Sequence, residues 1–251
     1  MLNNLIRFVA EAGLSGTVYN GFIVVDIVVL AIFVLPYRKK YNLTAGQTFF
    51  TLAIMLPLCF LWILLLAWAE NGFQYFGEKQ MLRGFVYFPL IAMLPARILK
   101  IRKEIIWDFL APCFALVGGF QRFGCMFAGC CYGYPSSWGL WNPIYKQILF
   151  PIQLIDCLAY LLVCAICVFA AKKEHYVGNG RIYPLFLVLF GGIRFFLEFL
   201  FDNHKIFGNV SVLALHAALM FAVGVVWLCC IKGKEARAAM QKIQSQSHTS
   251  T

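Results

Sequence analysis

The chain has 251 residues, of which 62% are hydrophobic and only 13% are charged, and its mean hydropathy is +0.78. This composition excludes a disordered chain and a soluble globular domain, because too little polar surface remains to cover an apolar core. A formal net charge of +10 would also suit a nucleic-acid-binding protein. The placement of the basic residues, described below, argues against that class.

The first segment, residues 1–15, is too short and too polar to span a bilayer. We expect an amphipathic helix that lies on the outer membrane surface. The start of the chain carries little charge, and the long apolar run behind it ends in Arg-Lys-Lys. This pattern favours a retained helix over a cleaved signal peptide.

Seven apolar stretches follow, with lengths near the roughly 20 residues that a spanning helix needs. Six are strong: residues 17–36, 46–69, 84–99, 151–171, 182–201 and 209–231. The seventh, 105–121, is weaker because Asp108 and Pro112 interrupt it. The pattern predicts an all-α integral membrane protein with about seven transmembrane helices. Residues 1–231 would form one membrane domain, and the polar residues 232–251 would form a frayed cytoplasmic tail.

The basic residues predict the orientation. Fourteen Lys and Arg follow the stretches 17–36, 84–99, 151–171 and 209–231 on one side of the membrane. The other side holds five: Arg7, Lys79, Arg83, Lys146 and Lys205. By the positive-inside rule the N-terminus lies outside and the C-terminus lies in the cytoplasm. The basic charge is therefore mostly topological, and no nucleic-acid partner is expected.

Two arginines, Arg122 and Arg194, lie inside these apolar segments. A charge in lipid costs at least about 2.5–3.5 kcal/mol and indicates a functional site by default. Arg194 and Glu198 are spaced i, i+4, so they share a helix face and can pair. A guanidinium fixed in this way suits a phosphate. Gly124 and further glycines around Arg122 would allow close approach of a ligand, or simply close packing of helices.

The polar residues of separate segments are expected at one depth. At a rise of about 1.5 Å per residue, Arg122 lies about 25 Å and Arg194 about 18 Å from the cytoplasmic end of their helices. Gln153 and Asp156 lie within about 8 Å of the outer surface, and His216 about 10 Å below it. This agreement favours a single anion-binding site in the outer half of the membrane.

Simpler interpretations of the same residues stay open. The Arg194–Glu198 pair could be a structural ion pair between helices. Gln153 and Asp156 could cap the start of their helix. His216 on an apolar helix could be a packing residue.

Ten cysteines are spread along the chain, and most lie in apolar helices, where a thiol packs as a small hydrophobe. Cys125, Cys130 and Cys131 differ because they cluster near the expected outer end of a helix. Their C-x4-C-C spacing matches no standard zinc or thioredoxin pattern. A disulfide, a metal site, a reactive thiol and simple packing all remain open for these three.

Three motifs follow one another in the second half of the chain. They are R-x-G-x(4)-G-x(3)-G from Arg122, FPIQLID from Phe150 to Asp156, and GGIRFFLEF from Gly191. They resemble, in order, Gly-Arg-x-Gly-Asn-Phe-x-Asn-Gly-Glu-x-x-Gly, His-Pro-x-Gln-Leu-Tyr-Glu and Gly-x-x-Arg-Phe-x-x-Glu-Phe of the prolipoprotein diacylglyceryl transferase family. The resemblance covers roughly residues 105–231.

The chain departs from the family pattern at several polar positions. Cys125 and Ala128 stand where the family has asparagine, and Cys130 stands where it has glutamate. Phe150 replaces a histidine, and Asp156 replaces a glutamate. The arginines of the motifs are kept.

The resemblance implies a transferase that moves diacylglycerol from phosphatidylglycerol to the lipobox cysteine thiol of exported prolipoproteins. Its partners would be phosphatidylglycerol, prolipoprotein signal peptides and the lipid bilayer. It would be a multi-pass protein of the bacterial cytoplasmic membrane, and no cofactor or metal is expected.

The resemblance also assigns roles to residues. The expected substrate-binding residues are Arg122, Arg194, Gly124 and Gln153, and the expected catalytic residues are Arg194, Glu198 and Asp156. Arg122 and Arg194 would contact the phosphate, and Glu198 would orient Arg194. The general base is not assigned, with Asp156, His216 and Tyr87 as candidates.

Two other functions remain as alternatives. One is a membrane thiol-redox or metal-handling protein that uses Cys125, Cys130 and Cys131. The other is a non-catalytic phospholipid-binding or transport relative that kept the anion site.

Overall fold

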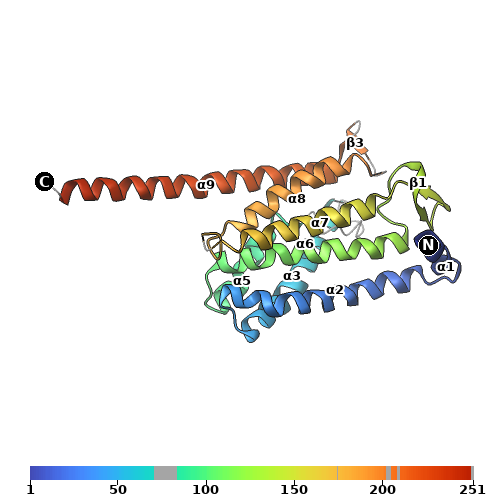
Figure 1. The fold of residues 1–251 in the computed structure, drawn as a ribbon, viewed down its shortest axis with the longest axis horizontal. Coiled ribbons are helices and arrows are strands. Elements are labelled where there is room, and N and C mark those ends of the chain that lie inside the picture. The colour runs from blue at the N-terminus through green and yellow to red at the C-terminus, as the bar shows by residue number, and fades with distance from the viewer. Residues whose placement is uncertain (71–83, 174, 202–204, 208–209, 250–251) are drawn as a thin grey trace.

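Long helices packed side by side form the body of the molecule (Figure 1). The structure is a computed structural model, and it describes residues 1–70, 84–173, 175–201, 205–207 and 210–249. In chain order the elements are α1 (Leu2–Glu11), α2 (Ser15–Tyr37), the 3-10 helix η1 (Arg38–Tyr41), α3 (Ala45–Glu70), α4 (Phe88–Ile91), α5 (Met93–Ile98), α6 (Lys103–Ala128), β1 (Pro135–Asn142), β2 (Gln147–Leu149), α7 (Ile152–Ala170), α8 (Ile182–Glu198), β3 (Lys205–Phe207), β4 (Val210–Ser211) and α9 (Val212–Thr249). Lys79 and Arg83, two basic residues assigned to the outer side, lie outside the described residues.

Within the part of the chain that the structure describes, five helices are long and apolar enough to cross a membrane: α2 with η1, α3, α6, α7 and the first part of α9. The stretch at 105–121, expected to be weak, is the middle of the complete helix α6. The stretch at 84–99 instead contains the two short helices α4 and α5, each with a proline near its start, Pro89 and Pro95. Proline suits a first helical turn and interrupts a helix interior, so two short helices form here. The protein is thus a mostly helical membrane protein.

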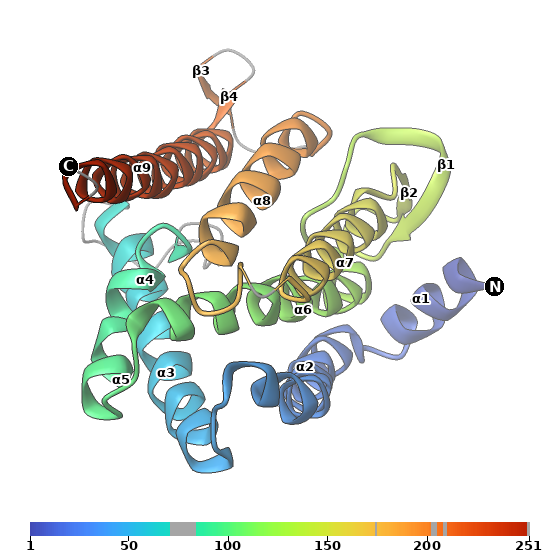
Figure 2. The same cartoon turned by 60° about the vertical axis from the view of Figure 1, so that its left-hand side comes forward.

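Helix α6 is the most enclosed of the five. In the most apolar 18-residue part of α6, 61% of the residues are buried, whereas in that of α2 only 17% are buried. It packs against α2 on one side and α7 on the other (Figure 2). A charged residue on α6 can therefore face protein, where partners can be supplied, instead of lipid.

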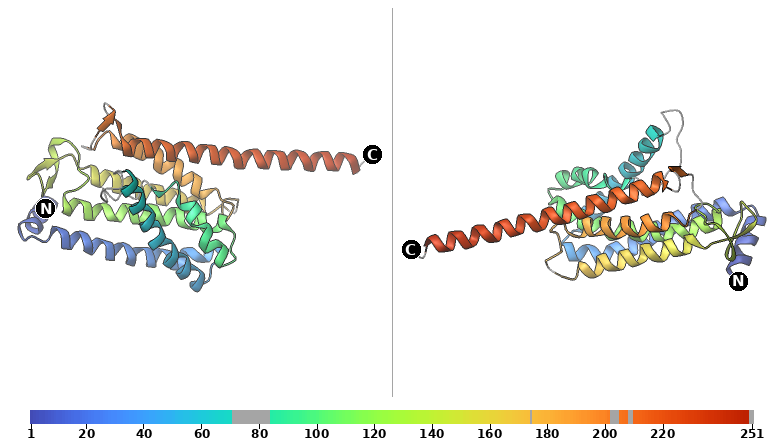
Figure 3. Two further views of the ribbon diagram at one scale, coloured as in Figure 1. Left: turned by 180° about the vertical axis from the view of Figure 1, so that it is seen from behind. Right: turned by 90° about the horizontal axis from the view of Figure 1, so that it is seen from above.

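Helices α8 and α9 pack closely because glycines line their contact. A Cβ atom on Gly191 would lie 2.7 Å from the carbonyl oxygen of Ala217, and one on Gly224 would lie 2.8 Å from that of Pro184. Small residues let membrane helices approach in this way. Helix α9 then continues unbroken to Thr249 and extends past the other helices (Figure 3). The backbone of residues 232–249 is therefore helical, where a frayed tail was expected.

Asp108 holds the start of α8 against α6. Its carboxylate accepts hydrogen bonds from the backbone N–H groups of Gly180 (2.9 Å), Ile182 (2.8 Å) and Tyr183 (3.3 Å). These groups have no partner within the helix itself, so the buried acid satisfies them. Asp108 is thus a structural residue at the end of α6 remote from Arg122.

The opposite end of the bundle is covered by α1 and the β1–β2 hairpin (Figure 1). The side-chain amide of Asn3 donates to the carbonyl oxygen of Gly139 (3.1 Å) and accepts from the N–H of Trp141 (3.0 Å). Ile6 and Val9 are buried in a cluster with Phe127. The first segment is therefore a helix, as expected, and it fixes the hairpin that precedes α7.

Candidate functional site

One buried carboxylate joins three helices at the end of the bundle that carries the β1–β2 hairpin. Asp156 on α7 is fully buried, and its Oδ2 atom lies 2.6 Å from Nε of Arg122 on α6. The same oxygen lies 3.4 Å from Nη1 of Arg194 on α8. A single acid thus holds two guanidinium groups together, and Arg194 is only 2% exposed.

Glu198 forms the second ion pair of the cluster. Its Oε2 atom lies 2.6 Å from Nη2 of Arg194, one helical turn away, so the pair expected from the i, i+4 spacing is confirmed. Its Oε1 atom accepts a hydrogen bond from the hydroxyl of Ser211 (2.9 Å), which also accepts one from the N–H of Ala214 at the start of α9. Glu198 therefore ties Arg194 to a fourth helix.

Aromatic rings line both arginines. The hydroxyl of Tyr160 accepts a hydrogen bond from Nη2 of Arg122 (3.1 Å), and the Tyr160 ring stacks on Phe190 with centroids 4.3 Å apart. The guanidinium of Arg194 lies 4.1 Å from the ring centroid of Phe201. Such faces attract cations and exclude water, so the two charges are held in fixed positions.

The formal charges of this cluster cancel at rest. Two guanidinium groups face the carboxylates of Asp156 and Glu198. Among the described residues, Oδ1 of Asp156 and Nε of Arg194 have no hydrogen-bond partner. A buried acceptor and a buried donor are therefore left over, and buried polar atoms of this kind call for an explanation such as a ligand or a catalytic role.

Gln153 and Gly124 hold the surroundings of the cluster. The amide of Gln153 donates to the carbonyl oxygen of Cys130 (3.1 Å), which ties the loop after α6 to α7. A Cβ atom on Gly124 would meet Phe22 and Tyr19 of α2 at 3.2 and 3.3 Å. The geometry at Gly124 is thus that of close helix packing, and its role in substrate binding stays a prediction.

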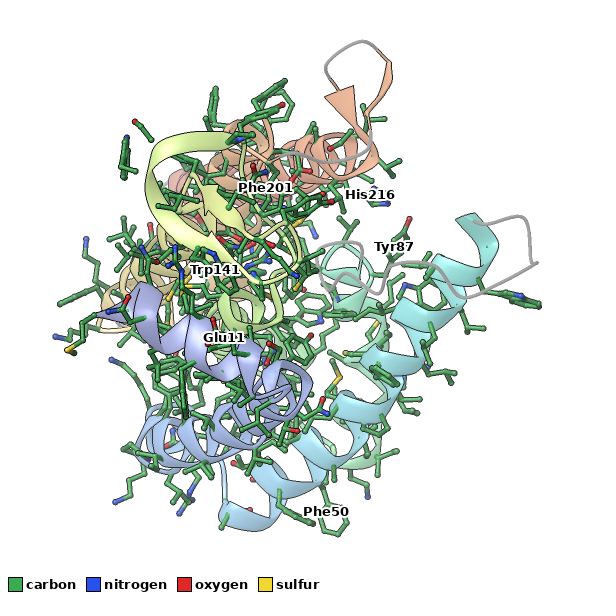
Figure 4. The ribbon with its side chains drawn as sticks, turned by 90° about the vertical axis from the view of Figure 1, so that its right-hand side faces the viewer. Glu11, Phe50, Tyr87, Trp141, Phe201 and His216 are labelled. Atoms are coloured by element: carbon green, nitrogen blue, oxygen red, sulfur yellow. The ribbon has the colours of Figure 1, made fainter. Side chains whose placement is uncertain are left out.

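For the other two candidates for a base, the described contacts are with residues outside the ion pairs. Nδ1 of His216 lies 2.9 Å from the carbonyl oxygen of Val212 in its own helix. The ring of Tyr87 contacts Trp62 of α3, with centroids 5.4 Å apart. Figure 4 shows His216 on the α9 side and Tyr87 beside α3. Of the three candidates, Asp156 has described contacts with both arginines.

The three cysteines expected to cluster do so. The Sγ atoms of Cys125, Cys130 and Cys131 all lie within 4.8 Å of one another. The thiols of Cys125 and Cys130 lower the pKa of Cys131 well below its ordinary value by hydrogen bonding, and Arg122 and Arg194 add to this by favouring the thiolate. Hydrogen bonds with the thiols of Cys125 and Cys131 raise the pKa of Cys130. The cluster is thus electrostatically connected to the arginine site.

Three contributors to the site were not expected from the sequence. Tyr160 lies one turn beyond Asp156 on the same helix face, so its i, i+4 spacing was an available signal. Ser211 and Phe201 had no comparable signal, because only the folded connection between α8 and α9 brings them to Arg194 and Glu198.

The amino-acid sequence of the chain is similar to those of known proteins. A family model described as prolipoprotein diacylglyceryl transferase matches residues 47–230. A phosphatidylglycerol–prolipoprotein diacylglyceryl transferase of Clostridium tetani (strain Massachusetts / E88) is 29% identical over 149 residues, covering 54% of this chain and 58% of that protein. The second enzyme of that name in Clostridium perfringens (strain 13 / Type A) is 29% identical over 114 residues, covering 43% of each chain. That of Chlamydia caviae (strain ATCC VR-813 / DSM 19441 / 03DC25 / GPIC) is 31% identical over 124 residues, covering 46% of this chain and 40% of that protein. The matched regions thus span only 40% to 58% of the length of these relatives.

Proposed function

Because the chain belongs to the prolipoprotein diacylglyceryl transferase family, we propose that it transfers diacylglycerol from phosphatidylglycerol to the lipobox cysteine thiol of prolipoproteins. The names of the three relatives support the reaction class and both substrates. The observation that carries the proposal is the sharing of one buried carboxylate oxygen by Arg122 and Arg194.

In the proposed reaction the substrate thiol loses its proton. Its sulfur then attacks the carbon of the diacylglycerol unit that is bonded to the phosphate oxygen. A C–S bond forms as the C–O bond breaks, and glycerol phosphate leaves with the electron pair. Arg122 and Arg194 contact the phosphate, whose charge grows in this step. Fixed donors aimed at developing charge stabilise a transition state more than a ground state.

Asp156 is the residue we assign as proton acceptor. Its protonation would remove one negative charge from a cluster whose charges otherwise cancel. The two arginines would then present a net positive charge at the moment when the leaving phosphate becomes more negative. Glu198 would meanwhile keep Arg194 in place. Proton uptake and phosphate departure would thus support each other.

The placement in the membrane follows as part of the proposal. We assign about seven spans, counting α8 and the α4–α5 segment with the five long helices, with the N-terminus outside and the C-terminus in the cytoplasm of a bacterial cell. The end with α1, the β1–β2 hairpin and the ion pairs would then face outward, where signal peptides of exported prolipoproteins arrive. Residues 232–251 would form a cytoplasmic extension.

Complementation of a bacterial strain depleted of its diacylglyceryl transferase tests the proposal. Wild-type protein should restore growth and lipoprotein modification, whereas Arg122→Ala should not. Arg181→Ala is the matched control, since Arg181 is a buried arginine that pairs with Glu235 at the opposite end of the bundle. Both variants should reach the membrane at wild-type levels. Failure of the inserted wild-type protein would reject the reaction and favour the phospholipid-binding alternative.

A further inference from the structure

Three thiols meet at the end of α6, beside the two arginines. Cys125 lies in the last turn of the helix and is 6% exposed, while Cys130 and Cys131 lie in the loop just after the helix and are half-buried. All three are free thiols with Sγ atoms within 4.8 Å of one another. We propose that Cys125, Cys130 and Cys131 bind a zinc ion through three thiolates and leave its fourth position for the incoming substrate thiol. The second half of this inference rests on the proposed transfer reaction.

The geometry needs little change to bind zinc. Zn–S bonds of about 2.3 Å in a tetrahedral arrangement separate the sulfur atoms by about 3.8 Å, which is inside the observed limit. Gly129 and Cys131 both have left-handed backbone, with φ of 75° and 53°, and these turns bring the loop back to Cys125. Glycine adopts this conformation freely, but for cysteine it is uncommon and must be held by its surroundings.

Two hydrogen bonds hold this loop from outside. The side-chain amide of Asn142 donates to the carbonyl oxygen of Gly129 (2.9 Å), and that of Gln153 donates to the carbonyl oxygen of Cys130 (3.1 Å). Both amides are buried. The three sulfur atoms are therefore preorganised by the hairpin and by α7, and are not only neighbours along the chain.

The charges also suit a cation of this kind. Soft thiolate ligands select zinc among the common divalent ions. Three thiolates and Zn²⁺ carry one net negative charge, and Arg122 interacts electrostatically with both Cys125 and Cys131. Structural zinc sites have four protein ligands, whereas catalytic sites keep three and leave one position open. A set of three thiol ligands therefore fits a catalytic zinc site, in which the fourth position is open.

The cysteines of the helix interiors form a contrast. Cys157 and Cys167 are fully buried, which is the behaviour of a packing residue. Cys130 and Cys131 are partly accessible, and they lie on a loop that is tied to the helix of Asp156. A thiol bound at the open position would thus reach the neighbourhood of the reacting groups.

The bonds that form and break with zinc bound are those of the proposed transfer reaction. Zinc binding lowers the pKa of a coordinated thiol, so the substrate thiol would bind as thiolate and give its proton to Asp156. The sulfur then forms the C–S bond, and glycerol phosphate leaves with the electrons of the C–O bond. No oxidant or reductant is needed. A zinc ion at these three thiols differs from the metal-free site that family resemblance alone implies.

Metal analysis of the purified full-length protein in detergent tests the site. Wild-type protein loaded with zinc and dialysed should retain about one equivalent per chain. Cys130→Ser and Cys131→Ser should lower this to about a tenth or less. The matched control is Cys229→Ser, which changes an exposed cysteine on α9. Cobalt in place of zinc should give a thiolate charge-transfer band in wild type and control only.

Wild-type protein without retained zinc, or with zinc that survives in Cys131→Ser, would overturn the inference. Zinc content is measured without lipid or peptide, so its result stands even where the transfer reaction fails. For active protein, zinc removal should slow transfer roughly 100-fold, and zinc should restore it. Full transfer by zinc-free protein would refute the role of the open position.

Discussion

Replacing Asp156 by asparagine removes one charge with almost no change in volume, and we expect both stability and activity to fall. Arg122 loses its 2.6 Å carboxylate partner and keeps the Tyr160 hydroxyl. Arg194 loses only the longer contact of 3.4 Å and keeps Glu198. Breaking a buried ion pair costs about 3–5 kcal/mol. Since one of the two arginines stays paired and the Arg122 side chain is 16% exposed, we expect a loss near 3 kcal/mol.

The effect on transfer should exceed the effect on folding. A positioned general base contributes about 10²- to 10⁴-fold, so Asp156→Asn should lower the rate per folded molecule by about that factor. Thermal unfolding in detergent measures stability, and transfer of labelled diacylglycerol measures activity. Asp108→Asn is the control, because it removes a buried carboxylate at the other end of the bundle and should destabilise without slowing folded enzyme. An Asp156→Asn variant with wild-type turnover would refute Asp156 as the proton acceptor.

Three further predictions concern the ion pairs and the orientation. Glu198→Ala should destabilise the protein by about 3–5 kcal/mol and slow transfer, because Arg194 loses its 2.6 Å partner. An unchanged unfolding temperature and unchanged turnover would show that the Arg194–Glu198 pair stabilises neither the fold nor the site. Arg122→Lys keeps the charge but loses the planar fork, so transfer should fall about 10- to 100-fold in correctly inserted protein; equal activity of Arg122→Ala would reject this arginine as a phosphate ligand. Ser137→Cys, at an exposed position of β1, should react with a membrane-impermeant maleimide in intact cells more than the unsubstituted protein does, and Gln241→Cys should not; labelling of Gln241→Cys from outside above that of the unsubstituted protein would overturn the orientation.

Hydropathy predicted most of the helices because length and apolar composition decide what can span a bilayer. It did not predict the break between α4 and α5, since Pro89 and Pro95 act on backbone hydrogen bonding and not on hydropathy. The tail was misjudged for a related reason. Polar composition excludes burial but not helicity, and the Lys, Glu, Ala, Arg and Gln residues after 231 are good helix formers.

The site was predictable where a signal lies within one helix. The spacing of Arg194 and Glu198 predicted their pair, and the estimated depths predicted that Arg122 and Asp156 would lie at one level. The bridging of both arginines by one oxygen of Asp156 was not predictable, because it depends on how α6, α7 and α8 pack. The same holds for Ser211, which reaches Glu198 from another helix.

Transfer of labelled diacylglycerol from phosphatidylglycerol to a lipobox peptide, followed together with release of glycerol phosphate, tests the central claim most directly. Purified wild-type protein should form the thioether and release glycerol phosphate in equal amounts, and a peptide with serine in place of the lipobox cysteine should yield neither. Wild-type protein that binds phosphatidylglycerol yet forms no thioether and releases no glycerol phosphate would contradict the account.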